Sequence, residues 1–113
     1  MDHELFEQPI NSYEAYRNVA DNRGQAIKLE FRLKSGDAEQ FEYSYLTRTS
    51  FNFPTGKIIM KFMDVIVTIE GNNLIRLKNE LRHNKIEWVQ EAESEFGNIN
   101  SESVLIKKIE LLI

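Results

Sequence analysis

A chain of 113 residues with 42% hydrophobic and 28% charged residues is typical of one globular domain, so residues 1–113 are expected to fold as a single unit. The chain contains no cysteine, which excludes disulfides, thiolate zinc sites and a thiolate nucleophile. Its formal net charge of −4 repels the nucleic-acid backbone, which disfavours binding to a duplex through bulk charge.

The N-terminal residues do not resemble an export signal. Residues 1–10 are acidic and lack the basic start and apolar run of a secretory signal, and no run of about 18 apolar residues follows. We therefore expect a cytoplasmic protein whose residues 1–10 form a flexible tail. Asn11 followed by Glu14 matches a capping box, which predicts a short helix over 12–20.

Two alternating runs predict a β-hairpin. Apolar and charged residues alternate over 27–34, as in a half-buried strand; the predicted core side chains are Ile27, Leu29, Phe31 and Leu33. After a turn at 35–37, a second strand carries an aromatic row of Phe41, Tyr43 and Tyr45. We interpret this row as core, although such rows also stack the bases of single-stranded nucleic acid. Leu46 breaks the alternation and predicts a bulge or bend near 45–47.

Two more strands are predicted over 57–63 and 65–70. The side chains expected on their buried faces are Ile58, Met60 and Phe62 in the first, and Val65, Val67 and Ile69 in the second. A tight reversal at Asp64 separates the two strands, and Gly71 is expected to end the second.

An amphipathic helix is predicted over 73–83. Leu74, Ile75, Leu77 and Leu81 recur at helical spacing and form the apolar stripe. The side chain of Asn72 or Asn73 is expected to cap the helix N-terminus, and Asn84 to close its C-terminus. Basic residues along or just after this helix form the candidate partner-binding site: Arg76, Lys78, Arg82 and Lys85.

A strand over 86–91 and an apolar tail over 104–113 follow. Trp88 is expected to anchor the helix against the sheet, with a binding hot spot as the alternative. The tail is interpreted as a strand, although a short helix fits almost as well. Its apolar end, 111–113, is expected to dock on its own domain or to pair with a second copy, which gives a homodimer.

These elements predict an α+β fold with a mostly antiparallel sheet of five to seven strands. Successive strands joined by short turns must be antiparallel, because parallel neighbours need long connections. The helix over 73–83 covers one face of the sheet, and the short N-terminal helix completes the domain.

Few residues could carry chemistry. His83 lies at the predicted helix end, where a cation is favoured for structural reasons alone. Glu91, Glu93 and Glu95 share strand parity and could bind a hard cation, but we prefer to interpret them as a charged strand edge. No glycine-rich phosphate-binding motif occurs. We therefore predict no catalytic residue, no cofactor and no metal site.

The sequence favours a non-catalytic interaction module that binds a protein partner or a second copy of itself. One alternative is binding of single-stranded nucleic acid through the basic segment 76–85. Another is a small-ligand-binding domain or enzyme with a pocket between helix and sheet, near His83 or Glu91.

Overall fold

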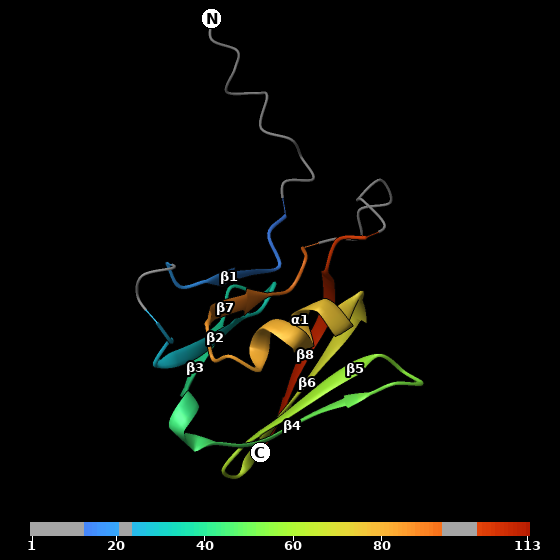
Figure 1. Cartoon of the computed structure of the whole chain (residues 1–113). Helices are drawn as coiled ribbons and strands as arrows, with labels where there is room; N and C mark the ends of the chain where they lie inside the picture. The colour runs from blue at the N-terminus through green and yellow to red at the C-terminus, as the bar shows by residue number, and fades with distance from the viewer. Residues whose placement is uncertain (1–12, 21–23, 94–101) are drawn as a thin grey trace, which may run out of the picture.

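A computed structural model describes residues 13–20, 24–93 and 102–113 (Figure 1). Sheet A contains, in spatial order, β1 (Tyr16–Asn18), β7 (Ile86–Gln90), β2 (Lys28–Arg32) and β3 (Ala38–Glu42). Sheet B contains β4 (Leu46–Asn52), β5 (Lys57–Phe62), β6 (Val65–Asn72) and β8 (Leu105–Leu112). One α-helix in these ranges, α1 (Leu74–Leu81), connects β6 of sheet B to β7 of sheet A.

An α+β fold with mostly antiparallel strands is confirmed, but the prediction of one sheet with five to seven strands is wrong. The short 3-10 helix η3 (Tyr43–Tyr45) follows β3 and leads into β4, so the chain changes sheets there. Pairing of β4 with β5 then shifts register between Leu46 and Arg48. The predicted bend near 45–47 is present, and it carries the chain from one sheet into the other.

Only β2 and β7 pair in parallel among the ladders of the described residues. Parallel neighbours require a long connection, and here the connection includes β3, all of sheet B except β8, and α1. The sequence between two such strands gives no local sign that they are neighbours.

The predicted N-terminal helix over 12–20 is wrong, because Tyr16–Asn18 forms β1 and pairs antiparallel with β7. The Val19 N–H donates to the Lys85 carbonyl at 2.7 Å, which continues the contact beyond the strand. These long-range backbone hydrogen bonds outweigh a local capping signal worth about 1 kcal/mol. Residues 1–12, with the predicted tail 1–10 and Asn11 of the capping box, lie outside the described residues.

The core lies between the inner faces of the two sheets and α1. Its fully buried side chains come from both sheets and the helix and include Leu29, Phe31, Ile58, Met60, Phe62, Val67, Ile69, Leu77, Ile86, Val89 and Ile106. Phe41 stacks on Phe62 with ring centroids 4.8 Å apart, and Phe31 meets both rings edge-on at 5.9 Å. Such contacts add to the energy of burial alone.

The predicted aromatic row is core at two of its three positions. Phe41 packs against the core, and Tyr43 is buried with its hydroxyl donating to the Ile86 carbonyl at 2.7 Å. Tyr45 is 50% exposed because η3 has replaced the strand alternation. Ile27, predicted to be core, is 76% exposed because it precedes the first paired residue of β2.

Strands β5 and β6 follow the predicted alternation, with Val67 and Ile69 buried opposite the buried residues of β5. The prediction that Gly71 ends β6 is wrong, because the strand continues to Asn72. A Cβ atom at Gly71 would overlap the carbonyl oxygen of Leu105 in β8. Gly71 therefore allows two backbones to approach closely within the sheet.

The predicted helix is present as α1, and its apolar stripe is narrower than predicted. Leu74, Leu77 and Leu81 are buried, whereas Ile75 is 44% exposed. The predicted side-chain cap is wrong: Asn73 has a φ of 60° and its Nδ2 donates to the Ser103 carbonyl at 2.7 Å. Asn84 has the expected left-handed conformation, with a φ of 54°. No helix in the described ranges has the length and apolar character that a membrane span requires.

The C-terminal tail is a strand, β8, and it docks on its own domain by pairing with β6. Its other edge is partly covered. The N–H of Ile106 donates to the Tyr13 hydroxyl at 3.1 Å, and its carbonyl accepts from Ala92 N–H at 2.9 Å. The Ile109 N–H donates to Glu91 Oε2 at 2.6 Å. A second copy could therefore pair only with the short stretch after Ile109.

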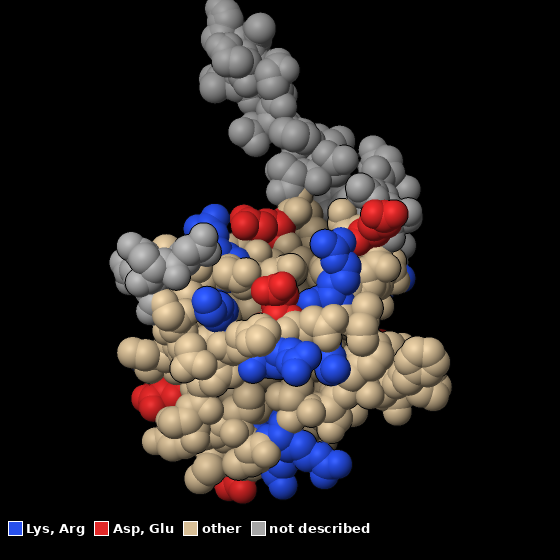
Figure 2. All heavy atoms as spheres, in the orientation of Figure 1, with Lys and Arg blue, Asp and Glu red and all other residues tan. Residues whose placement is uncertain are grey.

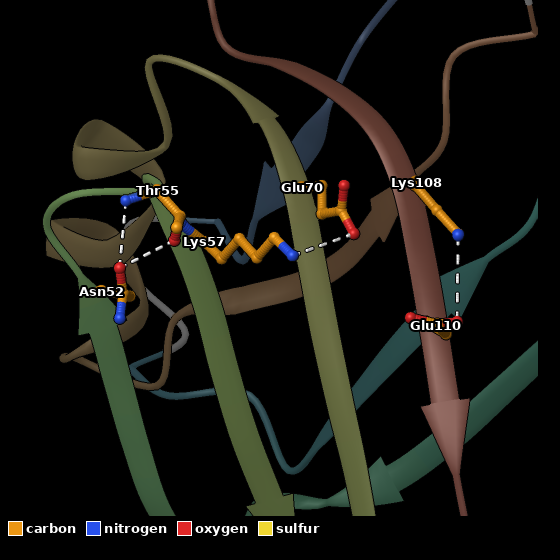
Figure 3. Close-up of polar contacts among 6 residues, drawn as sticks. All are labelled: Asn52, Thr55, Lys57, Glu70, Lys108 and Glu110. Atoms are coloured by element: carbon orange, nitrogen blue, oxygen red, sulfur yellow. Dashed lines mark hydrogen bonds and ion pairs between the residues drawn. The ribbon is translucent and has the colours of Figure 1, made fainter.

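The outer face of sheet B carries polar contacts that reach solvent (Figure 3). Lys57 Nζ lies 3.6 Å from Glu70 Oε2, and Lys108 Nζ lies 3.8 Å from Glu110 Oε2. At the turn between β4 and β5, Asn52 Oδ1 accepts hydrogen bonds from the N–H and the hydroxyl of Thr55. Ion pairs that reach solvent in this way contribute about 1 kcal/mol at most.

Candidate functional site

The outer face of sheet A carries a hollow of about 800 Å³ that opens to solvent. We call it the sheet A hollow; the lining residues that matter below are Arg17, Ile27, Lys28, Glu30, Arg32 and Trp88. It lies on this face because Leu29 and Phe31 point into the core, so the residues that alternate with them in β2 point outward.

Strand register places distant residues in one row across this face. Arg17 of β1 lies opposite Trp88 of β7, and Trp88 lies opposite Glu30 of β2. Glu30 in turn lies opposite Gln40 of β3, which also lines the hollow. Residues that face each other in neighbouring strands share a face of the sheet, so all four strands of sheet A contribute to the hollow.

Trp88 is buried outside the core. Ile86 and Val89 belong to the core cluster, whereas Trp88 does not, although it is only 7% exposed. The register of β1 passes from Trp88 directly to Ile86, so Glu87 is an extra residue that shifts the alternation of β7. The prediction that Trp88 anchors the helix against the sheet is therefore wrong.

Two guanidinium groups cover the Trp88 indole. The Cζ of Arg32 lies 4.2 Å from the ring centroid and that of Arg17 lies 5.4 Å away. Both distances are within the range of cation–π attraction, worth about 0.5–1 kcal/mol at exposed sites. The arginine side chains remain 40% and 57% exposed, so they also reach solvent.

Each arginine has one carboxylate contact. Arg32 Nε donates to Glu30 Oε1 at 3.2 Å, and Arg17 Nη2 donates to Glu14 Oε1 at 3.4 Å. A guanidinium has five N–H donors, and the described residues accept from one nitrogen of each group. The described residues leave the other donors of both groups without an acceptor.

The predicted partner-binding residues lie elsewhere, on and after α1. Figure 2 shows Lys and Arg side chains spread over the face that carries the helix. Lys78 is half-buried, and exposed Arg82 is four residues further on, so the two share a side of the helix. Arg76 projects from another side and donates through Nη1 to the Glu102 carbonyl at 2.8 Å. Half-buried Lys85 follows the helix. None of these four residues lines the sheet A hollow.

Glu91 has a structural role. It is 9% exposed, and its carboxylate accepts hydrogen bonds from the N–H of Lys34 at 2.8 Å and of Ile109 at 2.6 Å. Glu93 is exposed, and Glu95 lies outside the described residues. Across residues 13–20, 24–93 and 102–113, no three His, Cys, Asp or Glu residues are grouped to hold a metal ion.

The pocket expected near His83 or Glu91 does not coincide with the sheet A hollow, since neither residue lines it. His83 is exposed, and its carbonyl accepts from Gln25 Nε2 at 3.3 Å. The aromatic row also provides no stacking platform for bases, because only Tyr45 of its three rings is exposed.

The sequence reasoning missed Arg17 and Arg32. Arg32 could have been found, because the alternation over 27–34 places it on the outer face of a strand. Arg17 could not, because a local capping signal assigned it to a helix. The preferred interpretation placed Trp88 against the helix, and the binding hot spot was the alternative. The extra residue at Glu87, which turns Trp88 to the outer face, cannot be recognised in the sequence.

The sheet A hollow offers binding chemistry: an apolar floor, two guanidinium groups held over it and acidic groups beside them. Comparisons with protein-family models, curated proteins and solved structures find no match for this chain, so its function must be inferred from these residues.

Proposed function

We propose that this protein is a non-catalytic interaction module that binds a protein partner through the outer face of sheet A. One observation carries the proposal: Trp88 is buried beneath Arg17 and Arg32 on a concave face outside the core. Arginine is among the residues in which protein interfaces concentrate binding energy, and the buried indole positions both guanidinium groups. Both arginines remain partly exposed and so are accessible to a partner.

The lining favours a protein segment over a small apolar ligand. Small-molecule sites are mostly apolar and enclose most of their ligand. The sheet A hollow is open and carries both signs of charge, with Lys28 and Glu87 beside the two arginines. A protein segment presents polar and charged groups at several points, which suits such a surface.

Two further proposals are self-association through β8 and binding of a partner through the basic residues on and after α1. Pairing of β8 with a second copy is restricted by Tyr13, Glu91 and Ala92, which cover the first part of its free edge. Contact through Arg76, Lys78, Arg82 and Lys85 would form on another part of the molecule. We therefore assign the main contact to sheet A and a second contact to the helix residues.

The test uses a random peptide library displayed on phage and selected on the immobilised protein. Trp88 is the one tryptophan of the chain, so its indole N–H gives a single NMR resonance that reports on the site. We expect selected peptides to shift this resonance. We also expect them to bind about tenfold more weakly to an R17A/R32A variant.

Arg48→Ala is the matched control, because Arg48 lines a different hollow on the outer face of sheet B. This variant should bind the selected peptides as the wild type does. A selection without binders contradicts the proposal, as do peptides that leave the Trp88 resonance in place.

A further inference from the structure

We infer that the sheet A hollow recognises a carboxylate of an acidic partner segment, held by Arg32 and Arg17 above Trp88. The inference rests on the proposed function and specifies the chemistry of the partner. It rests on two properties of the guanidinium groups of Arg32 and Arg17. Most of their N–H donors have no acceptor among the described residues, and both groups are held by contacts with Trp88 and a carboxylate.

The contact of Arg32 with the indole leaves its terminal nitrogens available for a ligand. The Cζ of Arg32 lies over the indole, 4.2 Å from the ring centroid. Its N–H groups lie in the plane of the guanidinium, and the described residues accept from Nε alone, through Glu30. The two terminal nitrogens therefore present the fork that a carboxylate binds in a bidentate manner.

The fork is held before any partner arrives. Arg32 is fixed at two points, by the indole and by Glu30, and Arg17 is held by the same indole and by Glu14. Fixing a long side chain in advance reduces the entropy that binding must otherwise remove. Partial burial of Arg32 also removes part of its hydration beforehand, since its side chain is only 40% exposed.

Charge in the hollow favours a carboxylate over a phosphate. The lining includes three bases, Arg17, Lys28 and Arg32, against two acids, Glu30 and Glu87. One excess positive charge is matched by a singly charged carboxylate, whereas a doubly charged phosphate would exceed it. Ile27, which is 76% exposed in the same lining, offers contact to an apolar side chain of the bound segment. An acidic peptide with a neighbouring apolar residue fits both features.

The experiment resynthesises the peptides recovered in the selection, with Asp changed to Asn and Glu to Gln. These changes preserve shape and remove charge. We expect each acidic peptide to lose about tenfold in affinity on amidation, measured by titration of the Trp88 indole resonance. Inorganic phosphate and a short single-stranded oligonucleotide serve as further probes and are expected to leave the resonance unchanged.

Variants of Arg32 distinguish the effect of its bidentate hydrogen-bonding geometry from the effect of its positive charge. Arg32→Ala should lose the preference for acidic over amidated peptides. Arg32→Lys, which keeps the charge without the fork, should lose most of it. Arg48→Ala should keep the preference in full. If Arg32→Ala is found unfolded by circular dichroism, Arg17→Ala replaces it in the same comparison, because Arg17 lies on a different strand of the same hollow.

The outcomes distinguish the two proposals. Peptides that shift the Trp88 resonance but bind equally well after amidation overturn this inference and leave the proposed function standing. The same holds if phosphate or the oligonucleotide shifts the resonance and displaces the peptides. If no peptide shifts the resonance, the proposed function itself fails.

Discussion

The outer faces of the two sheets are built differently. On sheet B, ion pairs such as that of half-buried Lys57 with Glu70 share the outer face with a hollow of about 200 Å³. On sheet A, the hollow is about 800 Å³ and its floor is an indole that is 7% exposed. The inner faces of both sheets already supply the core. A large aromatic side chain covered by arginines on the opposite face is therefore better explained by binding than by folding.

The comparison separates regions whose contacts stabilise the fold from a region that contributes little to the free energy of unfolding. Sheet B and its junction with sheet A should be sensitive to small changes. The outer face of sheet A and the exposed face of α1 should tolerate them.

The largest effect is expected at Gly71 in sheet B. A methyl group there would meet the backbone of Leu105, which cannot move without disturbing β8. We expect Gly71→Ala to lower the free energy of unfolding by about 3 kcal/mol or more, measured by urea denaturation. Gly36→Ala is the control: its φ is 102° with no atom near the new methyl group, so about 1–2 kcal/mol is expected. Equal losses would show that β6 and β8 can separate at little cost.

The next effect is expected at the junction of the two sheets. Glu91 accepts from the Lys34 N–H, just after β2, and from the Ile109 N–H in β8. Glu91→Ala leaves two donors unsatisfied in a largely buried place and should cost about 3 kcal/mol in the free energy of unfolding. Exposed Glu93→Ala should change it by less than about 0.5 kcal/mol. Similar values for the two variants would mean that water replaces the carboxylate freely.

Alkaline pH should weaken the same junction. Burial, and secondarily the charge of Glu91, raise the pKa of Tyr13 to about 12 from 10.0, against the opposing effect of its hydrogen bond with Ile106. Tyr43 shows the same direction, because burial raises the pKa of its phenol. A raised pKa in the folded state means that the unfolded chain loses the proton first. Stability should therefore be complete below pH 10 and should fall as the pH rises from 10 toward 12.

Tyr13→Phe tests this pH dependence. Its hydroxyl donates to the Gln90 carbonyl and accepts from the Ile106 N–H, so the variant should lose about 1 kcal/mol at neutral pH. Between pH 10 and 12 its unfolding midpoint should fall less steeply than that of the wild type. Tyr45→Phe, at an exposed position, should keep the wild-type slope. A Tyr13→Phe slope equal to that of the wild type would refute the assignment.

A small effect is expected on the outer face of sheet A. Arg32→Ala removes one cation–π contact and one partly exposed ion pair. The free energy of unfolding should fall by about 1 kcal/mol at most, while the fluorescence of Trp88 changes as its cover is lost. If Arg32→Ala lowers the free energy of unfolding as much as Glu91→Ala does, the outer face of sheet A stabilises the fold. The proposed difference between the outer faces of the two sheets would then be wrong.

The smallest effect is expected on the side of α1 that carries half-buried Lys78 and exposed Arg82. A K78A/R82A variant leaves the contact of Arg76 with the Glu102 carbonyl intact. Its free energy of unfolding should change by less than about 0.5 kcal/mol. If these residues form a second contact, affinity for the partner of the sheet A hollow should fall and lose part of its salt dependence. Unchanged affinity at low salt would confine the interface to sheet A.

Local patterns predicted the elements whose stability depends on local spacing. The alternation in β2, β5 and β6 and the helical spacing of α1 each reflect one buried face, and the structure confirms those elements. The short strand β1 and the division into two sheets could not be predicted. The strand β1 depends on pairing with β7, and the division into two sheets depends on the turn at η3. Hydrogen bonds between distant strands cannot be recognised from the sequence near either strand.

The candidate site shows the same limit. Arg32 could be assigned to an outer strand face, but its neighbour Trp88 was assigned inward because the extra residue at Glu87 cannot be recognised in a run of six. The pairing that brings Arg17 to the same indole spans most of the chain. The basic residues of α1 were easier to notice because they are close together in the sequence.

The position of β7 sets the order in which the molecule can form. β7 is a central strand of sheet A, yet it follows β2 by more than half the chain. On the ribosome, β4, β5 and β6 can pair as soon as each emerges, because they are consecutive. Sheet A cannot be completed until β7, which follows α1, has been synthesised; until then β2 and β3 form an isolated hairpin. Folding should accordingly be slow, since such distant contacts close late, and the arginine-covered indole should be among the last features to assemble.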